Sequence, residues 1–213
     1  MSKVLIVSRT RMRNNNVCVG GIDVNTGAAL RLLNQNGFHE EANTCPYRIR
    51  DVWELDYACA IPGRPYPHSE DTIVNSRTKI GVLKHEISML DFLHRHNNIR
   101  IYQGSLLNVF EHKLNVTENG TLFINHDNVP MNSTCFWICD RDINRRDYNG
   151  KVRFNYDNNT RRWGYNISWV GEKLNPADTI PAQTLVRLSL ANWWAPDDSD
   201  IEERCYLQIS GTY

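Results

Sequence analysis

The chain has 213 residues, of which 41% are hydrophobic and 23% are charged. These values are typical of a soluble globular protein, either one large domain or two of about 100 residues each. Lysine and arginine number 24, as do aspartate and glutamate, so the zero net charge argues against an overall attraction to nucleic acid. The first apolar run is too short for a signal peptide or a membrane span. We therefore expect a cytoplasmic protein with no membrane partner.

The apolar runs of the first half predict five strands, over residues 4–7, 17–23, 28–33, 52–60 and 72–75. A basic, asparagine-rich loop over 9–16 follows the first of them. Asn25 and Gly27 supply the positive φ that a hairpin turn needs. Apolar residues then recur at spacings of three, four and three, which predicts an amphipathic helix near residues 79–96, with the stripe Ile80, Leu83, Ile87 and Leu90.

Residues 108–132 are rich in asparagine and predict short strands and turns, with 122–124 as the strand. This segment is also the best candidate for a join between two halves, which gives domains of 1–110, including the helix, and 111–213.

The last third alternates between apolar and polar residues, the pattern of strands with one buried face. The apolar sets are Val152, Phe154 and Tyr156, then Val186, Leu188 and Leu190, then Cys205, Leu207 and Ile209. Lys151 and Arg153 lie opposite the first set, and Arg187 lies opposite the second. The pattern therefore predicts a half-buried antiparallel sheet that shows positive charge to solvent.

Six cysteines are scattered along the chain, and most lie in apolar runs, where a reduced thiol behaves as a small hydrophobic group. Cys135 and Cys139 could face the same side of a strand, but zinc would need two more ligands and there is no second cysteine pair. His94 and His96 lie at a helix end. We expect no metal and no other cofactor, while a nucleophilic cysteine with a distant histidine stays open.

The charge is unevenly distributed. Residues 1–38 carry five basic side chains against one acidic side chain, and residues 141–162 carry seven against three, so each stretch has a local charge of +4. Acidic residues gather between 197 and 203. A basic face could attract phosphates while the whole chain stays neutral, although ordinary solvated arginines would give the same pattern.

Several short motifs resemble those of the bacterial dual OB-containing domain family. The resemblance rests on residues 3–9, 18–23, 26–27, 30–33, 52–56, 67–71, 150–154, 188–190 and 205–207. It spans nearly the whole chain. The sequence departs from the family pattern at 166–169, where a Thr-Asp pair is expected.

The resemblance implies two tandem five-stranded OB barrels, a mainly β fold that commonly binds single-stranded nucleic acid or nucleotides. Such proteins combine basic side chains along the phosphates with aromatic platforms for the bases. The basic candidates are Arg9, Arg11, Arg13, Arg31, Lys151, Arg153, Arg161 and Arg162. The aromatic candidates are Tyr156, Trp163, Tyr165, Trp169, Trp193 and Trp194. Trp163 is the strongest of these because it follows two arginines in a predicted hairpin.

The sequence therefore favours a non-enzymatic protein that binds single-stranded nucleic acid or a nucleotide-derived ligand. One alternative is an enzyme centred on His68, Glu70 and Asp71, which could form a proton relay, although a polar strand entry after a proline loop explains the same residues. Another is an accessory module that works beside a separately encoded enzyme. Its acidic loop over 196–203 would suit a basic protein partner.

Overall fold

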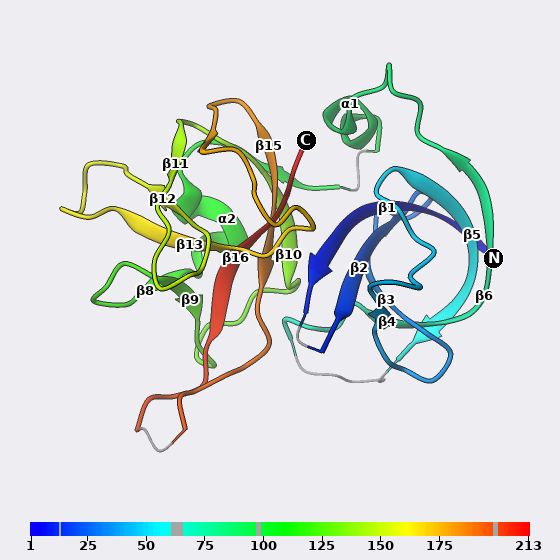
Figure 1. Cartoon of the computed structure of the whole chain (residues 1–213), viewed down its shortest axis with the longest axis horizontal. Coiled ribbons are helices and arrows are strands. Elements are labelled where there is room, and N and C mark those ends of the chain that lie inside the picture. The colour runs from blue at the N-terminus through cyan, green and yellow to red at the C-terminus, as the bar shows by residue number, and fades with distance from the viewer. Residues whose placement is uncertain (13, 61–65, 97–98, 198–199) are drawn as a thin grey trace. The chain divides into compact units, whose positions relative to one another are not determined.

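The computed structural model describes residues 1–12, 14–60, 66–96, 99–197 and 200–213 (Figure 1). The chain forms two compact units. The first is mainly residues 1–100 together with Tyr213, and the second is mainly 101–212 together with 66–68. The main division thus lies between Arg100 and Ile101, inside the first of the two expected domains.

The first unit is a closed barrel of five strands with a short sixth strand at its edge. Its strands are β1 (Ser2–Arg11), β2 (Asn16–Asp23), β3 (Ala29–Leu33), β4 (Glu40–Glu41), β5 (Asp51–Cys59) and β6 (Asp71–Val82). The order β1-β2-β3-β6-β5 closes because β5 pairs with β1, and among the strand pairs of its described residues only β3 and β6 run parallel. This is the Greek-key order of an OB barrel.

Alternation along the strands fills the barrel with apolar side chains. Val4 and Ile6 of β1 are fully buried, and they pack with Val19 and Leu32 of the next strands. Gly21 faces the same interior, where an added Cβ would lie 2.6 Å from Cγ1 of Val4. The close packing of β1 on β2 therefore requires glycine at this position.

The helix expected near 79–96 is much shorter, so this prediction is wrong at its start. Only α1 (Met89–His94) is helical there, and it begins at the capping residue Ser88, whose hydroxyl accepts from the Asp91 amide at 3.0 Å. Ile80 lies in β6, where the ladder to β5 continues as far as Val82.

The segment between β6 and α1 is held by a side chain instead of by helical hydrogen bonds. The Arg50 guanidinium donates to the carbonyls of Leu83, Lys84 and Ile87 at 3.3, 2.5 and 2.8 Å. These carbonyls would accept from backbone amides in a longer helix. The regular spacing of apolar residues here reflects a strand followed by an anchored loop.

In its described residues the second unit has two short helical turns and ten strands. Its elements are β7 (Ile101–Tyr102), η1 (Leu106–Asn108), α2 (Val109–His112), β8 (Asn115–Val116), β9 (Leu122–Ile124), β10 (Thr134–Ile138), β11 (Ile143–Arg145), β12 (Arg153–Tyr156), β13 (Tyr165–Trp169), β14 (Thr179–Ile180), β15 (Leu185–Leu190) and β16 (Cys205–Thr212). The strand predicted over 122–124 is β9.

The curled sheet of the second unit repeats the strand order of the first. Its central order is β11-β12-β13-β16-β15-β10, and the pairing of β13 with β16 is parallel, like that of β3 with β6. The strands β10 and β11 follow one another along the chain with a break at 139–142, so together they take the place of β1. Both units are therefore OB-like, which confirms the predicted mainly β fold.

One basic residue of the predicted solvent face is buried. Arg187 of β15 is only 6% exposed, and its Nη1 atom donates to the Ser210 hydroxyl at 2.9 Å. The register between β15 and β16 shifts beside Arg187, which leaves Ser210 as the extra residue of a bulge. Both faces of β15 are covered, so the alternation there does not mark a solvent face.

Among the helices of the described ranges, none has the length and apolar character needed to cross a membrane.

Candidate functional site

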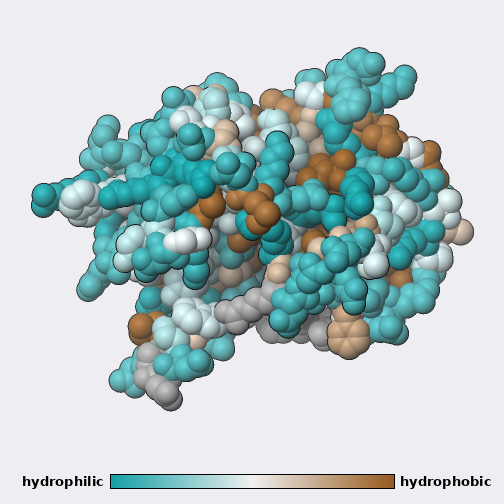
Figure 2. All heavy atoms as spheres, in the orientation of Figure 1, coloured by the Kyte–Doolittle hydropathy of each residue, from teal (hydrophilic) through white to brown (hydrophobic). Residues whose placement is uncertain are grey.

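A row of asparagines crosses the outward face of three strands in the second unit. The register places Asn144 of β11 opposite Asn155 of β12, and Asn155 opposite Asn166 of β13. Side chains of directly paired residues lie on the same face of a sheet. The alternate residues Phe154 and Ile167 are fully buried. This outward face is therefore polar, and Figure 2 shows hydrophilic surface over this part of the unit.

A basic row lies beside the asparagines. The Arg146 amide donates to the Arg153 carbonyl at 2.8 Å, and Arg153 is paired with Ser168 of β13. A tight hairpin turn links Arg146 to Arg153. In this turn Asn149 and Gly150 have φ of 49° and 70°, the combination that a type I′ turn requires. Lys151 is exposed at the end of the turn.

Trp163 lies in the connection between β12 and β13, and its side chain is 60% exposed. The guanidinium carbons of Arg162 and Arg146 lie 4.9 and 5.8 Å from its ring centroid, within the range of cation–π attraction. Asn155 Nδ2 donates to the Trp163 carbonyl at 2.8 Å. The polar row thus fixes the backbone that carries the exposed indole.

A second exposed ring accompanies the basic row. Tyr148 is 61% exposed, and the guanidinium carbon of Arg153 lies 5.7 Å from its centroid. We call the set of residues Arg146, Tyr148, Lys151, Arg153, Arg162 and Trp163 the basic-aromatic face. Positive charge and exposed rings alternate on it, a combination suited to phosphates and bases.

The charges of this face differ from those of the neighbouring arginines. Arg141 and Arg145 form ion pairs with Asp140 and Asp147 at 3.0 and 2.7 Å. The hydrogen bond from Arg145 lowers the pKa of Asp147 below its ordinary value, so that carboxylate is held ionised. Within the described ranges, no carboxylate forms an ion pair with the four cations of the basic-aromatic face. The face therefore keeps its positive charge.

The structure brings together four of the residues that the sequence singled out in the second half, namely Lys151, Arg153, Arg162 and Trp163. Arg161 points elsewhere and donates to the Glu118 carbonyl at 2.6 Å. Sequence reasoning missed Arg146 and Tyr148. The turn-forming Asn149-Gly150 pair could have revealed them, because it folds Arg146 back beside Arg153.

The basic candidates of the first half do not form a comparable surface. Arg9 is buried and donates to the Ala42 carbonyl at 3.4 Å, and Arg31 forms an ion pair with Asp71. Arg11 is exposed at the end of β1. Arg13 lies outside the described residues. Two of these four arginines thus hold the barrel together.

Most of the aromatic candidates belong to the core or to its margin. Tyr156, Tyr165 and Trp169 are buried, and the Trp193 ring stacks on His126 with centroids 3.8 Å apart. Trp194 is 52% exposed and lies in the connection between β15 and β16, where its backbone pairs with Arg204 and its ring contacts Tyr206. Trp163 is therefore the exposed aromatic candidate of this face.

The three residues of the possible proton relay are all buried. His68 Nε2 lies 3.4 Å from the Leu190 carbonyl within the second unit, whereas Glu70 and Asp71 belong to the first unit. The Asp71 carboxylate forms an ion pair with the Arg31 guanidinium. Over the described ranges no three His, Cys, Asp or Glu side chains lie close enough together to hold a metal ion.

Comparison with known proteins identifies the family. No curated protein and no solved structure matches the chain. The family model of the dual OB-containing domain matches residues 2–212, which is nearly the whole chain. The match agrees with the strand order repeated in the two units. The chain therefore belongs to the dual OB-containing domain family.

Proposed function

We propose that this protein is a binding module that takes single-stranded nucleic acid on the basic-aromatic face of its second unit, without catalysing a reaction. The observation that carries the proposal is the exposed Trp163 ring, which has Arg146 and Arg162 within cation–π distance. A second observation supports it. Tyr148 is 61% exposed and its ring centroid lies 5.7 Å from the Arg153 guanidinium carbon, so the face presents a second ring beside a further cation.

The chemistry of the face accounts for binding without sequence preference. Bases stack on exposed aromatic rings with about 1–3 kcal/mol per base, and every base offers a π-face. The cations Arg146, Lys151, Arg153 and Arg162 would neutralise phosphates and release counterions. Four such contacts give a slope of log affinity against log salt of about −3 for a single strand.

The proposal is tested by fluorescence anisotropy with a labelled, mixed-sequence single strand at low and at physiological salt. We expect affinity to fall with salt, and to fall at least tenfold in a Trp163→Ala variant. Arg162→Ala should weaken binding and make the salt slope shallower by about 0.7. Arg95→Ala is the matched control, because Arg95 is exposed on the first unit.

Two results would contradict this function. Absence of binding at both salt concentrations would show that the protein does not bind single-stranded nucleic acid. Equal losses in Arg162→Ala and Arg95→Ala would show a general charge effect and no specific face. A thermal shift by a mononucleotide that saturates and depends weakly on salt would instead favour a small nucleotide ligand on the same rings.

A protein partner is the second candidate function, and it rests on the connection between β15 and β16. Trp194 is 52% exposed and Ile201 is 45% exposed there, next to Asp200, Glu202 and Glu203. Apolar side chains among acidic ones suit a basic protein surface. Binding of a basic peptide that is lost in Trp194→Ala and kept in Trp163→Ala would favour this function.

A further inference from the structure

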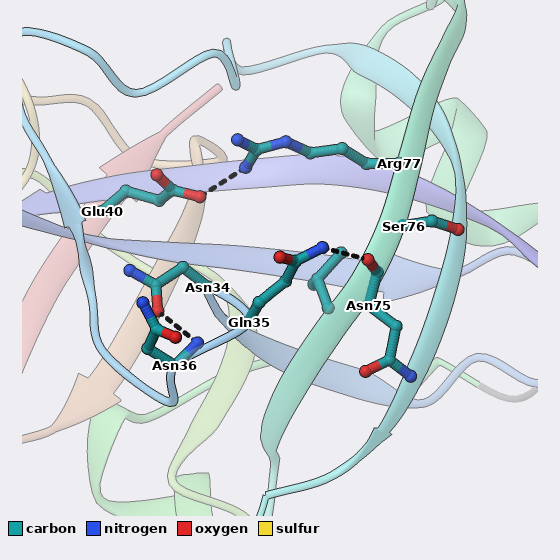
Figure 3. Close-up of a pocket in the computed structure, with 8 residues that line it drawn as sticks. Asn34, Gln35, Asn36, Glu40, Asn75, Ser76 and Arg77 are labelled. Atoms are coloured by element: carbon teal, nitrogen blue, oxygen red, sulfur yellow. Dashed lines mark hydrogen bonds and ion pairs between the residues drawn. The ribbon is translucent and has the colours of Figure 1, made fainter.

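A polar cavity is lined wholly by residues of the first unit. Its volume is about 460 Å³, within the range of small-molecule sites. The lining residues are Asn34, Gln35, Asn36, Glu40, Val74, Asn75, Ser76 and Arg77 (Figure 3). One wall is the connection between β3 and β4, and the other is the middle of β6. The cavity thus opens where the parallel strands β3 and β6 separate after Leu33 and Ile73.

The first wall is a rigid turn. The Asn34 side chain accepts from the amides of Asn36 and Phe38 at 3.0 and 3.1 Å, and the Asn34 amide donates to the Phe38 carbonyl at 2.8 Å. Gly37 has a φ of +78°, which favours glycine and closes the turn. The side-chain amides of Gln35 and Asn36 therefore project from a backbone that these hydrogen bonds fix in place.

The second wall contains a β-bulge. Asp56 of β5 is paired with Ser76 of β6, but Tyr57 is paired with Val74, so Asn75 is the extra residue. Gln35 Nε2 donates to the Asn75 carbonyl at 2.5 Å across the cavity. Bulges redirect side chains and are over-represented next to functional sites. Here the bulge turns the Asn75 carbonyl toward the opening, while the Asn75 side-chain amide donates to Asp56 Oδ2 at 3.4 Å (Figure 3).

The charged groups of the cavity are fixed and balanced. Arg77 forms an ion pair with Glu40, and its guanidinium carbon lies 5.2 Å from the centroid of the Tyr47 ring. The carboxylate and the guanidinium cancel, so the lining has no net charge. A carboxylate has about four acceptor positions and a guanidinium has five donors, so both groups keep hydrogen-bonding capacity beside their ion pair.

This set of groups selects a class of ligand. A phosphate would meet Glu40 as well as Arg77, and a nucleobase would find no aromatic ring among the lining residues on which to stack. Two neighbouring hydroxyls, by contrast, each donate and accept, and they match adjacent amide, carboxylate and guanidinium groups. We infer that the cavity binds a neutral vicinal diol, supplied either by a free sugar or by the ribose of a nucleoside.

The test is a titration of the whole chain followed by the side-chain amide resonances of Gln35, Asn36 and Asn75 in nitrogen–proton spectra. The probes are D-glucose, D-ribose, adenosine and 2′-deoxyadenosine, each at up to about 10 mM, which saturates a site with a dissociation constant near 1 mM. Shifts with D-glucose alone would identify a free sugar. Shifts with ribose and adenosine but not with 2′-deoxyadenosine would identify a ribose. Either result supports the diol.

Variants locate the binding. Asn36→Ala removes an exposed amide while leaving the Asn34 bonds that form the turn, and it should weaken binding at least fivefold. Glu40→Gln should do the same by removing the carboxylate. The control is Asn132→Ala, an exposed asparagine of the second unit, which should bind as well as the unaltered protein.

Three results would overturn the inference. Equal shifts with adenosine and 2′-deoxyadenosine would show that the base and not the diol is bound. Absence of shifts with all four probes would show that the cavity is no diol site. Unchanged binding in both Asn36→Ala and Glu40→Gln would place the ligand elsewhere. None of these results bears on the Trp163 variants, so the proposed function stands or falls separately.

Discussion

Asn155 and Trp163 are joined by a hydrogen bond of 2.8 Å from the asparagine Nδ2 atom to the tryptophan carbonyl. The bond ties the outward face of β12 to the connection that carries the exposed indole. In an Asn155→Ala variant this connection loses its anchor, at a cost of about 1 kcal/mol. We therefore expect single-strand affinity to fall by about fivefold, less than in Trp163→Ala, as measured by anisotropy.

The control for this prediction is again Asn132→Ala, which removes an exposed amide outside the face. The role that we propose for Asn155 is to position Trp163. In a Trp163→Ala background, Asn155→Ala should therefore have little further effect, because the ring it positions is gone. Independent, additive losses in the double variant would contradict this positioning role.

Gly164 follows Trp163 and has a φ of +61°, and an added Cβ would lie 2.8 Å from the Tyr156 carbonyl oxygen and 2.9 Å from Asn155 Oδ1. Gly150 has a φ of +70°, but nothing lies within 4 Å of the corresponding point. Both alanine variants carry the left-handed backbone cost of about 1–2 kcal/mol, and Gly164→Ala carries a steric clash as well. We expect Gly164→Ala to unfold at lower urea and to bind more weakly than Gly150→Ala.

This pair of variants separates backbone strain from packing. Equal loss of unfolding free energy in both variants would show that the close approach at Gly164 has no energetic weight.

The sequence predicted the strands best where one face of the sheet is buried and the other is exposed to solvent. In β12, Phe154 and Tyr156 point inward while Arg153 points outward, so the period of two identifies both faces. The same period misled the interpretation of β15, because a bulge at Ser210 provides a buried hydroxyl for Arg187. The choice between a buried and an exposed arginine depended on a partner in another strand, which local pattern does not contain.

The candidate site was only partly predictable for a similar reason. Trp163 and Arg162 are neighbours in the chain, so their proximity was visible in the sequence. Arg146 approaches Trp163 from another hairpin, and that contact depends on the register between β11 and β12. The sequence did not predict the cavity of the first unit. Gln35 and Asn75, which line opposite walls of it, are 40 positions apart in the chain, and a local pattern does not show that they meet.

Arg31 and Asp71 face one another in the parallel pair of β3 and β6 and form an ion pair in which both side chains are largely buried. Replacement of Arg31 by methionine would leave the Asp71 carboxylate buried beside an apolar group. Breaking such a pair costs about 3 kcal/mol or more. We expect Arg31→Met to lower the urea midpoint clearly, while single-strand affinity of the folded protein stays within twofold.

The affinity measurement tests whether Arg31 belongs to the binding surface. A large loss of single-strand affinity in folded Arg31→Met would show that Arg31 contacts the nucleic acid. The matched comparison is Arg153→Met, in which affinity should fall and the unfolding free energy should change less, because Arg153 makes no ion pair among the described residues.

Cys139 and Cys205, two of the three buried thiols of the described residues, should make stability depend on alkaline pH. Burial raises the pKa of Cys139 and of Cys205 from 9.0 to about 12, and the nearby carboxylates of Asp140 and Glu203 add to the respective shifts. The folded state therefore holds these protons more tightly than the unfolded state. Their contribution to stability is complete below about pH 9 and is lost as the pH rises toward about 12.

Urea unfolding at about pH 7 and about pH 10 measures this effect as a difference between variants, which removes the contribution of other groups that titrate in the same range. The double variant Cys139→Ala, Cys205→Ala should lose less unfolding free energy over this interval than Cys59→Ala, since Cys59 is exposed. In the folded protein at about pH 8, a thiol reagent should modify the exposed Cys59 quickly and the buried Cys139 and Cys205 slowly, because thiolate is the reactive form. Rapid modification of Cys139 or Cys205 without unfolding would contradict their burial, and an unchanged pH dependence in the double variant would contradict the raised pKa values.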